Sequence, residues 1–228
     1  MKSLAFLPAI ALLALGCQTH HEYVDDDGPP HVSDEVYAHV PESARDDVAD
    51  EHAEWARVKD EVSMKQREVE LERQRLAIAR DEEDNAEDSV QTAARAVDLA
   101  HDSAHDDDDD VVDDANDALE KARSRWRAAA SKVAFHDARV QELQADVSLA
   151  KQRVELAEAK VELAKAKAVH DVDHEGCPIC RRVNVTSFEA NVREHETRIK
   201  MAEVDAEAAK KKAELREKAL DDADDDVG

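Results

Sequence analysis

The sequence predicts an all-α fold, an elongated antiparallel coiled coil arranged as a three-helix bundle. Between Pro41 and Gly176 lie 134 consecutive residues without glycine or proline, the two residues that most readily end helices. Valine and alanine recur with heptad spacing through most of this run, as in the seam of a left-handed coiled coil. Aromatic residues make up only 3% of the chain, which suits long seams of small side chains better than a globular core.

The chain begins with a predicted signal peptide over residues 1–16. Lys2 precedes an apolar stretch from Leu4 to Leu15, followed by the small residue Gly16, which is the layout of a secretory signal. The apolar stretch is shorter than the ~20 residues that a membrane-spanning helix needs. We therefore expect an exported protein.

The end of this leader, Leu13-Ala14-Leu15-Gly16-Cys17, resembles the lipobox of bacterial lipoproteins. The resemblance implies that Cys17 becomes the first mature residue and carries the lipid, palmitate included. Gln18 follows in place of the aspartate that often marks inner-membrane retention, so the resemblance implies an outer-membrane protein facing the periplasm or the cell surface. Ordinary secretion with a free Cys17 is the alternative.

Residues 17–43 are polar and rich in turn-forming residues, which predicts a flexible linker behind the lipid anchor. The first helix is expected over 44–104. Its predicted seam residues, alternately three and four apart, are Trp55, Val58, Val62, Lys65, Val69, Glu72, Leu76, Ala79, Glu83, Ala86, Val90, Ala93, Val97, Ala100 and Ala104.

The second helix is expected over 112–170. Leu149, Leu156 and Leu163 widen its apolar face, as expected for contact with two neighbours or with another chain. Its predicted seam residues are Leu119, Ala122, Trp126, Ala129, Val133, His136, Val140, Leu143, Val147, Ala150, Val154, Ala157, Val161, Ala164 and Ala168.

The seam shifts phase between these two helices, where five adjacent aspartates, residues 106–110, repel one another. We therefore expect a turn near 103–112 that makes the first two helices antiparallel neighbours. The alternative is one continuous rod up to ~200 Å long, at 1.5 Å per residue.

A second break is expected over 171–183, which contains Gly176 and Pro178. A third, shorter helix is predicted over 184–221, followed by an acidic tail over 222–228. The predicted seam residues of this third helix are Phe188, Val192, His195, Ile199, Ala202, Ala206, Ala209, Ala213, Arg216 and Leu220. We expect the polar seam residues either to set register or to lie at solvated ends of the seam; they are Lys65, Glu72, Glu83, His136, His195 and Arg216.

The second break is the only segment in which the sequence suggests a chemical site. His170 and His174 are four residues apart, and Cys177 and Cys180 are three apart, spacings that can converge on one ion. Three interpretations stay open: a disulfide between the two cysteines, a zinc or copper site, and a reactive dithiol beside Arg181 and Arg182. A metal site could use both histidines and both cysteines, or four cysteines from two chains.

The sequence Cys177-Pro178-Ile179-Cys180 also resembles the zinc hook of the coiled-coil ATPases of chromosome repair. In that family two apices join through one zinc ion held by four cysteines. The resemblance implies tip-to-tip joining only, since the chain carries no nucleotide-binding motif.

Net charge and the motifs of the sequence restrict the classes of function that we expect. The net charge of −25 argues against nucleic acid and anionic lipid surfaces as partners. No nucleophile–base arrangement or phosphate-binding loop is recognisable, so we expect no enzyme. The leading hypothesis is a lipid-anchored coiled-coil protein of the bacterial envelope, a spacer or interaction platform that self-associates or binds an envelope partner. The alternative is a metal-binding lipoprotein that uses the cluster over residues 170–180.

Overall fold

The structure, a computed structural model, describes residues 29–103, 109–172, 180 and 183–225. Three long helices dominate it: α2 (Asp46–Ser103), α3 (Asp109–His170) and α4 (Val185–Asp225). The one-turn helix α1 (Asp34–Tyr37) and the 3₁₀ turn η1 (Glu42–Ala44) precede them. The all-α prediction is confirmed for the described residues.

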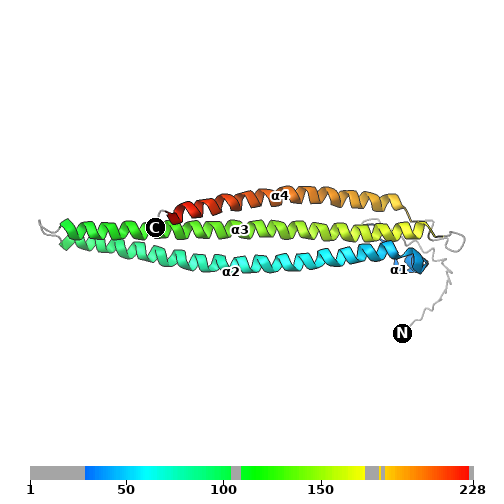
Figure 1. Ribbon diagram of the computed structural model, residues 1–228, viewed down its shortest axis with the longest axis horizontal. Helices are drawn as coiled ribbons and strands as arrows, with labels where there is room; N and C mark the ends of the chain where they lie inside the picture. Colours follow the sequence, from blue (N-terminus) through cyan, green and yellow to red (C-terminus); the bar gives the residue numbers. More distant parts are fainter. Residues whose placement is uncertain (1–28, 104–108, 173–179, 181–182, 226–228) are drawn as a thin grey trace, which may run out of the picture.

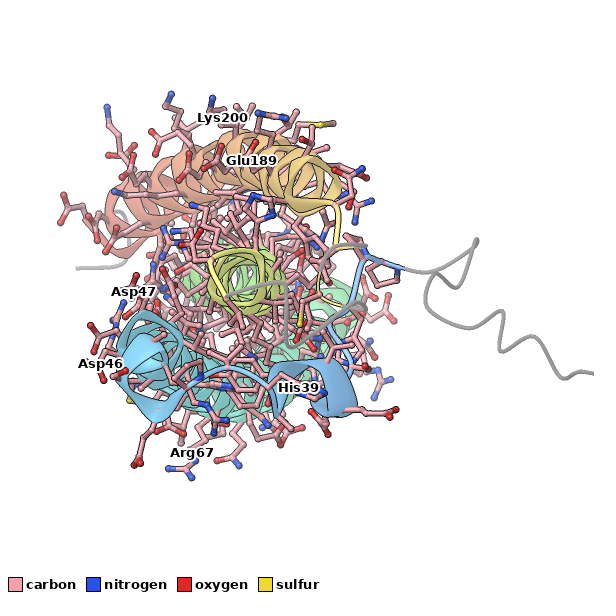
Figure 2. The ribbon with its side chains drawn as sticks, turned by 90° about the vertical axis from the view of Figure 1, so that its right-hand side faces the viewer. His39, Asp46, Asp47, Arg67, Glu189 and Lys200 are labelled. Atoms are coloured by element: carbon pink, nitrogen blue, oxygen red, sulfur yellow. The ribbon has the colours of Figure 1, made fainter. Side chains whose placement is uncertain are left out.

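The long helices pack antiparallel as a three-helix bundle with α3 in the middle (Figure 1). Viewed along the rod, α2 and α4 lie on opposite sides of α3 (Figure 2). Because α2 and α3 run side by side in opposite directions, the alternative of one continuous rod is wrong. We call the end that holds α1 and the start of α4 the base, and the opposite end the tip.

The α2–α3 seam follows the predicted heptads. Every predicted seam residue of α2 from Trp55 to Ala100 is buried or half-buried, while most of the residues between them are exposed. Val69, Leu76 and Ala79 are at most 7% exposed. Small side chains at these positions let the two backbones approach closely, and burial of the valines and leucines supplies the hydrophobic stabilisation.

The middle helix α3 has a second apolar stripe that faces α4. It contains Leu149, Leu156 and Leu163 together with the buried Ala138, Ala159 and Ala166. The widened face thus serves two neighbours within one chain. Towards the tip the same stripe continues as Ser124, Lys121 and Asp117, which are polar.

The change in the stripe coincides with the end of α4. The Lys212 ammonium donates to the Gln141 side-chain oxygen at 2.8 Å, and 13 residues of α4 follow Lys212. Equal rise along both helices places the end of α4 near residue 128 of α3. Beyond that level the rod is only two helices thick (Figure 1). Trp126, predicted to lie in the seam, is 38% exposed there, and Arg216 near the end of α4 is also exposed.

Interhelical ion pairs follow one antiparallel register between α2 and α3. From one pair to the next, the residue number increases on α2 and decreases on α3, as expected for antiparallel helices. The N···O distances are 3.7 Å for Glu61–Arg153, 3.0 Å for Lys65–Asp146, 2.6 Å for Glu72–His136 and 2.6 Å for Glu82–Lys132. Two residues predicted to set register, Glu72 and His136, therefore pair with each other.

The predicted linker over 17–43 needs correction for the part that the structure describes. Val32, Val36 and Val40 are at most 3% exposed and pack in one cluster with Val169, Phe188 and Cys180. Three valines four residues apart present one apolar face, and that face covers the end of the bundle at the base. Residues 17–28 lie outside the described residues.

The helix bounds also differ slightly from those expected. α2 begins at Asp46, after the 3₁₀ turn, where we expected 44; α3 begins at Asp109, where we expected 112; and α4 continues to Asp225, beyond 221. The acidic residues of the predicted tail up to Asp225 therefore extend the helix. Among the described residues, none of the helices combines the length and the apolar character that crossing a membrane requires.

Candidate functional site

At the base, Glu162 of α3 connects the N-terminal segment to the bundle. Its carboxylate accepts the backbone N–H of Val32 at 2.8 Å and the Lys165 ammonium at 2.7 Å, and lies 3.1 Å from Nδ1 of His31. The Glu162 side chain is only 13% exposed, so these contacts replace water around a largely buried carboxylate. Glu162 thus fixes where the chain enters the rod.

Arg45 contacts the other end of the same N-terminal segment. Its guanidinium donates to the Val40 carbonyl at 2.7 and 2.9 Å and lies 5.1 Å from the centroid of the Tyr37 ring. Those contacts cap the carbonyls that follow α1 and hold the segment against α2. The segment is therefore a docked part of the domain from Val32 onwards.

The predicted cysteine and histidine cluster lies at this end and is described only in part. His170 is the last residue of α3 and is exposed. Cys180 is fully buried in the base cluster and is disulfide-bonded. His174 and Cys177 lie outside the described residues, as does Cys17, so the Cys177–Cys180 pairing stays a prediction.

A metal site in this cluster also stays a prediction. Zinc binds cysteine as the thiolate, and the sulfur of Cys180 is already bonded to another sulfur. Within the ranges that the structure describes, no group of three or more histidine, cysteine, aspartate or glutamate side chains could hold a metal ion. This statement does not extend to His174 and Cys177.

A polar layer interrupts the apolar seam in the middle of the rod. Nδ1 of His136 lies 2.6 Å from a Glu72 oxygen, with the two side chains 13% and 5% exposed. In the next turn of α3, Arg139 donates to Glu142 at 2.5 Å. Burial works to lower the pKa of Arg139, but its hydrogen bond and ion pair with Glu142, helped by Glu72, raise that pKa overall. The layer is paired and offers no reactive group.

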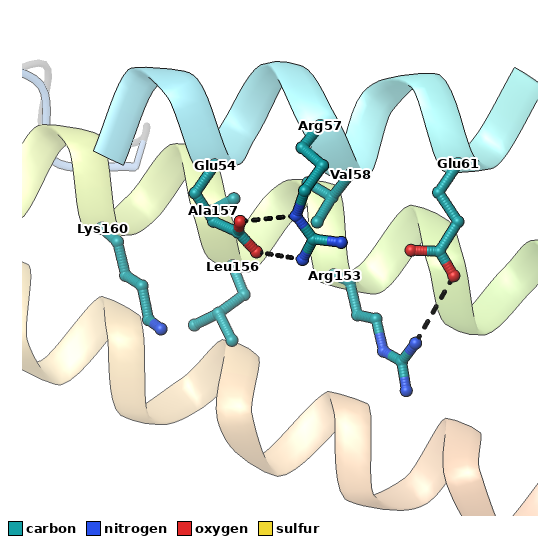
Figure 3. A pocket seen from close by; sticks show the side chains of 8 residues that line it. All are labelled: Glu54, Arg57, Val58, Glu61, Arg153, Leu156, Ala157 and Lys160. Atoms are coloured by element: carbon teal, nitrogen blue, oxygen red, sulfur yellow. Dashed lines mark hydrogen bonds and ion pairs between the residues drawn. The ribbon is translucent and has the colours of Figure 1, made fainter. Parts of the chain in front are cut away.

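Two open grooves follow the helix interfaces. The first, about 320 Å³ between α2 and α3, is lined by charged ends that largely pair with one another (Figure 3). Arg57 holds Glu54 through two hydrogen bonds of 2.5 and 2.7 Å, which lower the pKa of Glu54 and raise that of Arg57. Such paired, solvent-exposed charges contribute little stability and do not form a catalytic arrangement.

The second groove, about 800 Å³, lies between α3, α4 and Pro29–His31 at the base. Its walls carry carboxylates such as Glu155 and Glu194 and the imidazole of His195. Nδ1 of His195 is buried and lies 3.6 Å from Glu155, beyond hydrogen-bonding distance. The groove is polar and open along its length, unlike the apolar concave pockets that hold small molecules.

Acidic side chains predominate at the tip. Described residues 94–103 and 110–120, which we call the acidic tip, contain seven aspartates and glutamates and a single basic residue, Arg95. This acidic end of the rod lies opposite the docked N-terminal segment (Figure 1). The aspartate run predicts an acidic turn, whereas its position opposite the N-terminal segment depends on where that segment docks, which the sequence does not show.

Comparison of the chain with protein-family models, with curated proteins and with solved structures finds no match.

Proposed function

We propose that this protein is a lipid-anchored, non-catalytic coiled-coil spacer of the bacterial envelope, which projects its acidic tip away from the membrane. The observation that carries the proposal is the position of the N-terminal segment. Val32, Val36 and Val40 are buried at the base, whereas the acidic tip lies at the far end of α3. With 62 residues, α3 is roughly 93 Å long at 1.5 Å per residue, and that length sets the spacing.

The docked segment makes the proposed tether short. If Cys17 carries the lipid, the twelve residues from Cys17 to Gly28 span at most ~40 Å when fully extended. A linker that stayed free to residue 43 would span about 90 Å and would let the rod lie in any orientation. Docking through Glu162 and the valines therefore keeps the base, rather than the tip, close to the anchored end.

The negative charge of the acidic tip favours an orientation in which the tip of the proposed spacer points away from the membrane. Seven carboxylates against one arginine create a negative potential that repels anionic lipid headgroups and anionic polymers. Screening at physiological salt limits this effect to ~8 Å, so the tip acts on surfaces and partners that it almost touches. The tip suits a cationic envelope partner and does not suit nucleic acid.

Labelling with a clickable palmitate analogue in a bacterial host tests the anchor. We expect the wild-type chain to carry the label and to sediment with the outer membrane. Cys17→Ser should lose both, while the matched control Cys177→Ser should keep both. Recovery of the wild-type chain unlabelled in the soluble fraction would refute the anchor.

Lipid quenching tests the spacer. The anchored protein carries one fluorophore, either at Glu42 beside the base or at Leu99 in the acidic tip, in vesicles that contain a headgroup quencher. We expect more quenching at residue 42 than at residue 99, because the short tether keeps the base nearer to the headgroups than the tip. Equal quenching at both positions would show that the rod lies flat and would contradict the spacer.

A further inference from the structure

Six of the nine large apolar side chains that stand exposed among the described residues form two stripes. The α2 stripe consists of Met64, Leu71 and Ile78, spaced by seven and 56–58% exposed. The α4 stripe consists of Met201, Val204 and Leu215, 67–70% exposed, with the exposed Ala208 between them. Seven-residue spacing places such side chains in one line along a helix, as in a coiled-coil seam.

The two stripes lie at overlapping levels of the rod. On α2, Leu71 lies next to Glu72, which pairs with His136 of α3, and Met64 lies next to Lys65, which pairs with Asp146. On α4, Lys212 bonds Gln141 of α3, between those two levels, and Leu215 follows one turn later. The two stripes therefore overlap along the middle of α3, with the α2 stripe extending further towards the tip and the α4 stripe further towards the base.

The stripes face away from each other. Leu71 follows the seam residue Val69 by two positions, and Leu215 follows the seam residue Ala213 by two positions, so both leucines lie at the same angle, ~200° around the helix from that seam residue. α2 and α4 both run antiparallel to α3 and so are parallel to each other. Figure 2 shows α2 and α4 on opposite sides of α3. Equal rotations from opposite sides place the two stripes on opposite flanks of the rod.

A sideways shift of one molecule, without rotation and without axial displacement, brings its α2 stripe onto the α4 stripe of a second copy. We propose that this protein associates laterally in this way, α2 stripe to α4 stripe, with all rods parallel and in register. Such a contact joins two different surfaces, so it extends into rows rather than closing at a dimer. Parallel rods with their bases at one level also match molecules that stand on one membrane.

Local charge permits the contact. Residues 57–80 of α2 and residues 198–218 of α4 each carry seven basic and five acidic side chains. The negative charge of the chain lies outside these two segments, at the acidic tip and in the N-terminal part of the chain up to Glu54, so it opposes lateral contact away from the stripes. Each segment carries a net charge of only +2, so a copy of the same chain meets little electrostatic repulsion at the level of the stripes.

The contact is small. Three large side chains on each surface bury less than the ~1,000 Å² that a specific complex free in solution usually needs. We therefore expect monomers at micromolar concentration in solution and association once the chains are confined to a surface, where the local concentration is far higher. Confinement through a tag makes the test independent of acylation, so failure of the lateral contact and failure of the lipid anchor can be told apart.

Photo-cross-linking identifies the surfaces. The chain without residues 1–16 carries an N-terminal histidine tag, is bound to vesicles with nickel-chelating lipid, and has benzoylphenylalanine in place of Leu71. Mixing isotopically heavy and light copies marks intermolecular products in the mass spectrum. We expect heavy–light products that join residue 71 to the α4 segment between Met201 and Leu215. Products that join α2 to α2, or no heavy–light product, would overturn the proposal.

Variants then test the polarity of the contact, with energy transfer between N-terminal fluorophores as the readout. Leu71→Glu alone and Leu215→Glu alone should each lower the association constant about tenfold or more, since every contact then loses a buried leucine. Mixing the two variants should restore pairing, because one has an intact α4 stripe and the other an intact α2 stripe. A loss of energy transfer with only one of the two variants, or no recovery of energy transfer in the mixture, would contradict the proposed contact.

Leu99→Glu is the matched control. Leu99 is 68% exposed, on α2 but outside both stripes, and its substitution should leave energy transfer unchanged. Circular dichroism should show the same helicity and the same melting temperature for all three variants, because each substitution is at an exposed position. If Leu99→Glu lowers energy transfer as much as Leu71→Glu does, added charge rather than the stripe is responsible and the proposal is wrong.

Discussion

Replacing His136 with leucine removes the interhelical partner of a carboxylate that is buried between α2 and α3. The Glu72 side chain is 5% exposed, and its distance to Nδ1 of His136 is 2.6 Å. Breaking a buried ion pair from one side typically costs 3–5 kcal/mol, because the remaining charge loses both water and its partner. Glu72 keeps Arg75 at 3.1 Å on its exposed side, so we expect the lower end, about 3 kcal/mol.

The free energy of unfolding is measured by urea denaturation followed by circular dichroism at pH 7. For a chain of this size, a loss of 3 kcal/mol corresponds to a fall in Tm of roughly 6–12 °C. Replacing both residues by leucine leaves no unpaired charge, so the double variant should come within about 1 kcal/mol of wild type or exceed its stability. Arg75→Leu, which removes only the exposed partner, should cost less than about 1 kcal/mol.

Comparison of the unfolding free energies of the single and double variants tests whether Glu72 and His136 are coupled. A His136→Leu variant within about 0.5 kcal/mol of wild type would show that Glu72 is not a desolvated carboxylate that depends on His136. A double variant that loses as much as the sum of the single variants would show that the two residues act independently and would refute the coupling.

Three further predictions follow from other parts of the rod. Arg57→Gln should raise the pKa of Glu54 back towards its ordinary value in an NMR titration. The ion pair stabilises the ionised form of Glu54, so its small contribution to folding stability is present at neutral pH and is lost as the pH falls through the lowered pKa. An unchanged titration curve would contradict the hydrogen bond. Val36→Asp should place a charge at a position that is 3% exposed, undock the N-terminal segment and expose it to limited proteolysis, whereas Ala38→Asp, at an exposed position of the same segment, should leave the cleavage pattern unchanged. Ala206→Leu should lower the stability of the α3–α4 contact by about 1–3 kcal/mol through overpacking, while Ala208→Leu, on the exposed side of the same helix, should be nearly neutral by thermal unfolding.

The seam of α2 could be predicted almost residue by residue because burial in a coiled coil depends on a repeat that the sequence carries locally. Even its polar members were informative, since Glu72 and His136 occupy seam positions and pair with each other. The turn between α2 and α3 was expected from the phase shift of the seam and from the aspartate run. In each case the signal lies in neighbouring residues.

The base could not be predicted in the same way. Val32, Val36 and Val40 form an apolar face, but a single one-turn helix among prolines and polar residues resembles a linker when it is considered alone. Their burial depends on Val169 and Phe188, which are more than 120 residues away in the sequence. Four-residue spacing of the valines was the available signal, and only the position of the bundle end shows what it packs against.

The end of α4 near residue 128 of α3 divides the rod into two mechanical sections. Resistance to bending rises steeply with cross-section, so the three-helix part behaves as a stiff shaft and the two-helix part as a more compliant end. A sideways load at the far extremity therefore produces most of its curvature beyond the last turn of α4, near Trp126. The base and the middle of the molecule keep their orientation while the charged extremity swings over a range of positions.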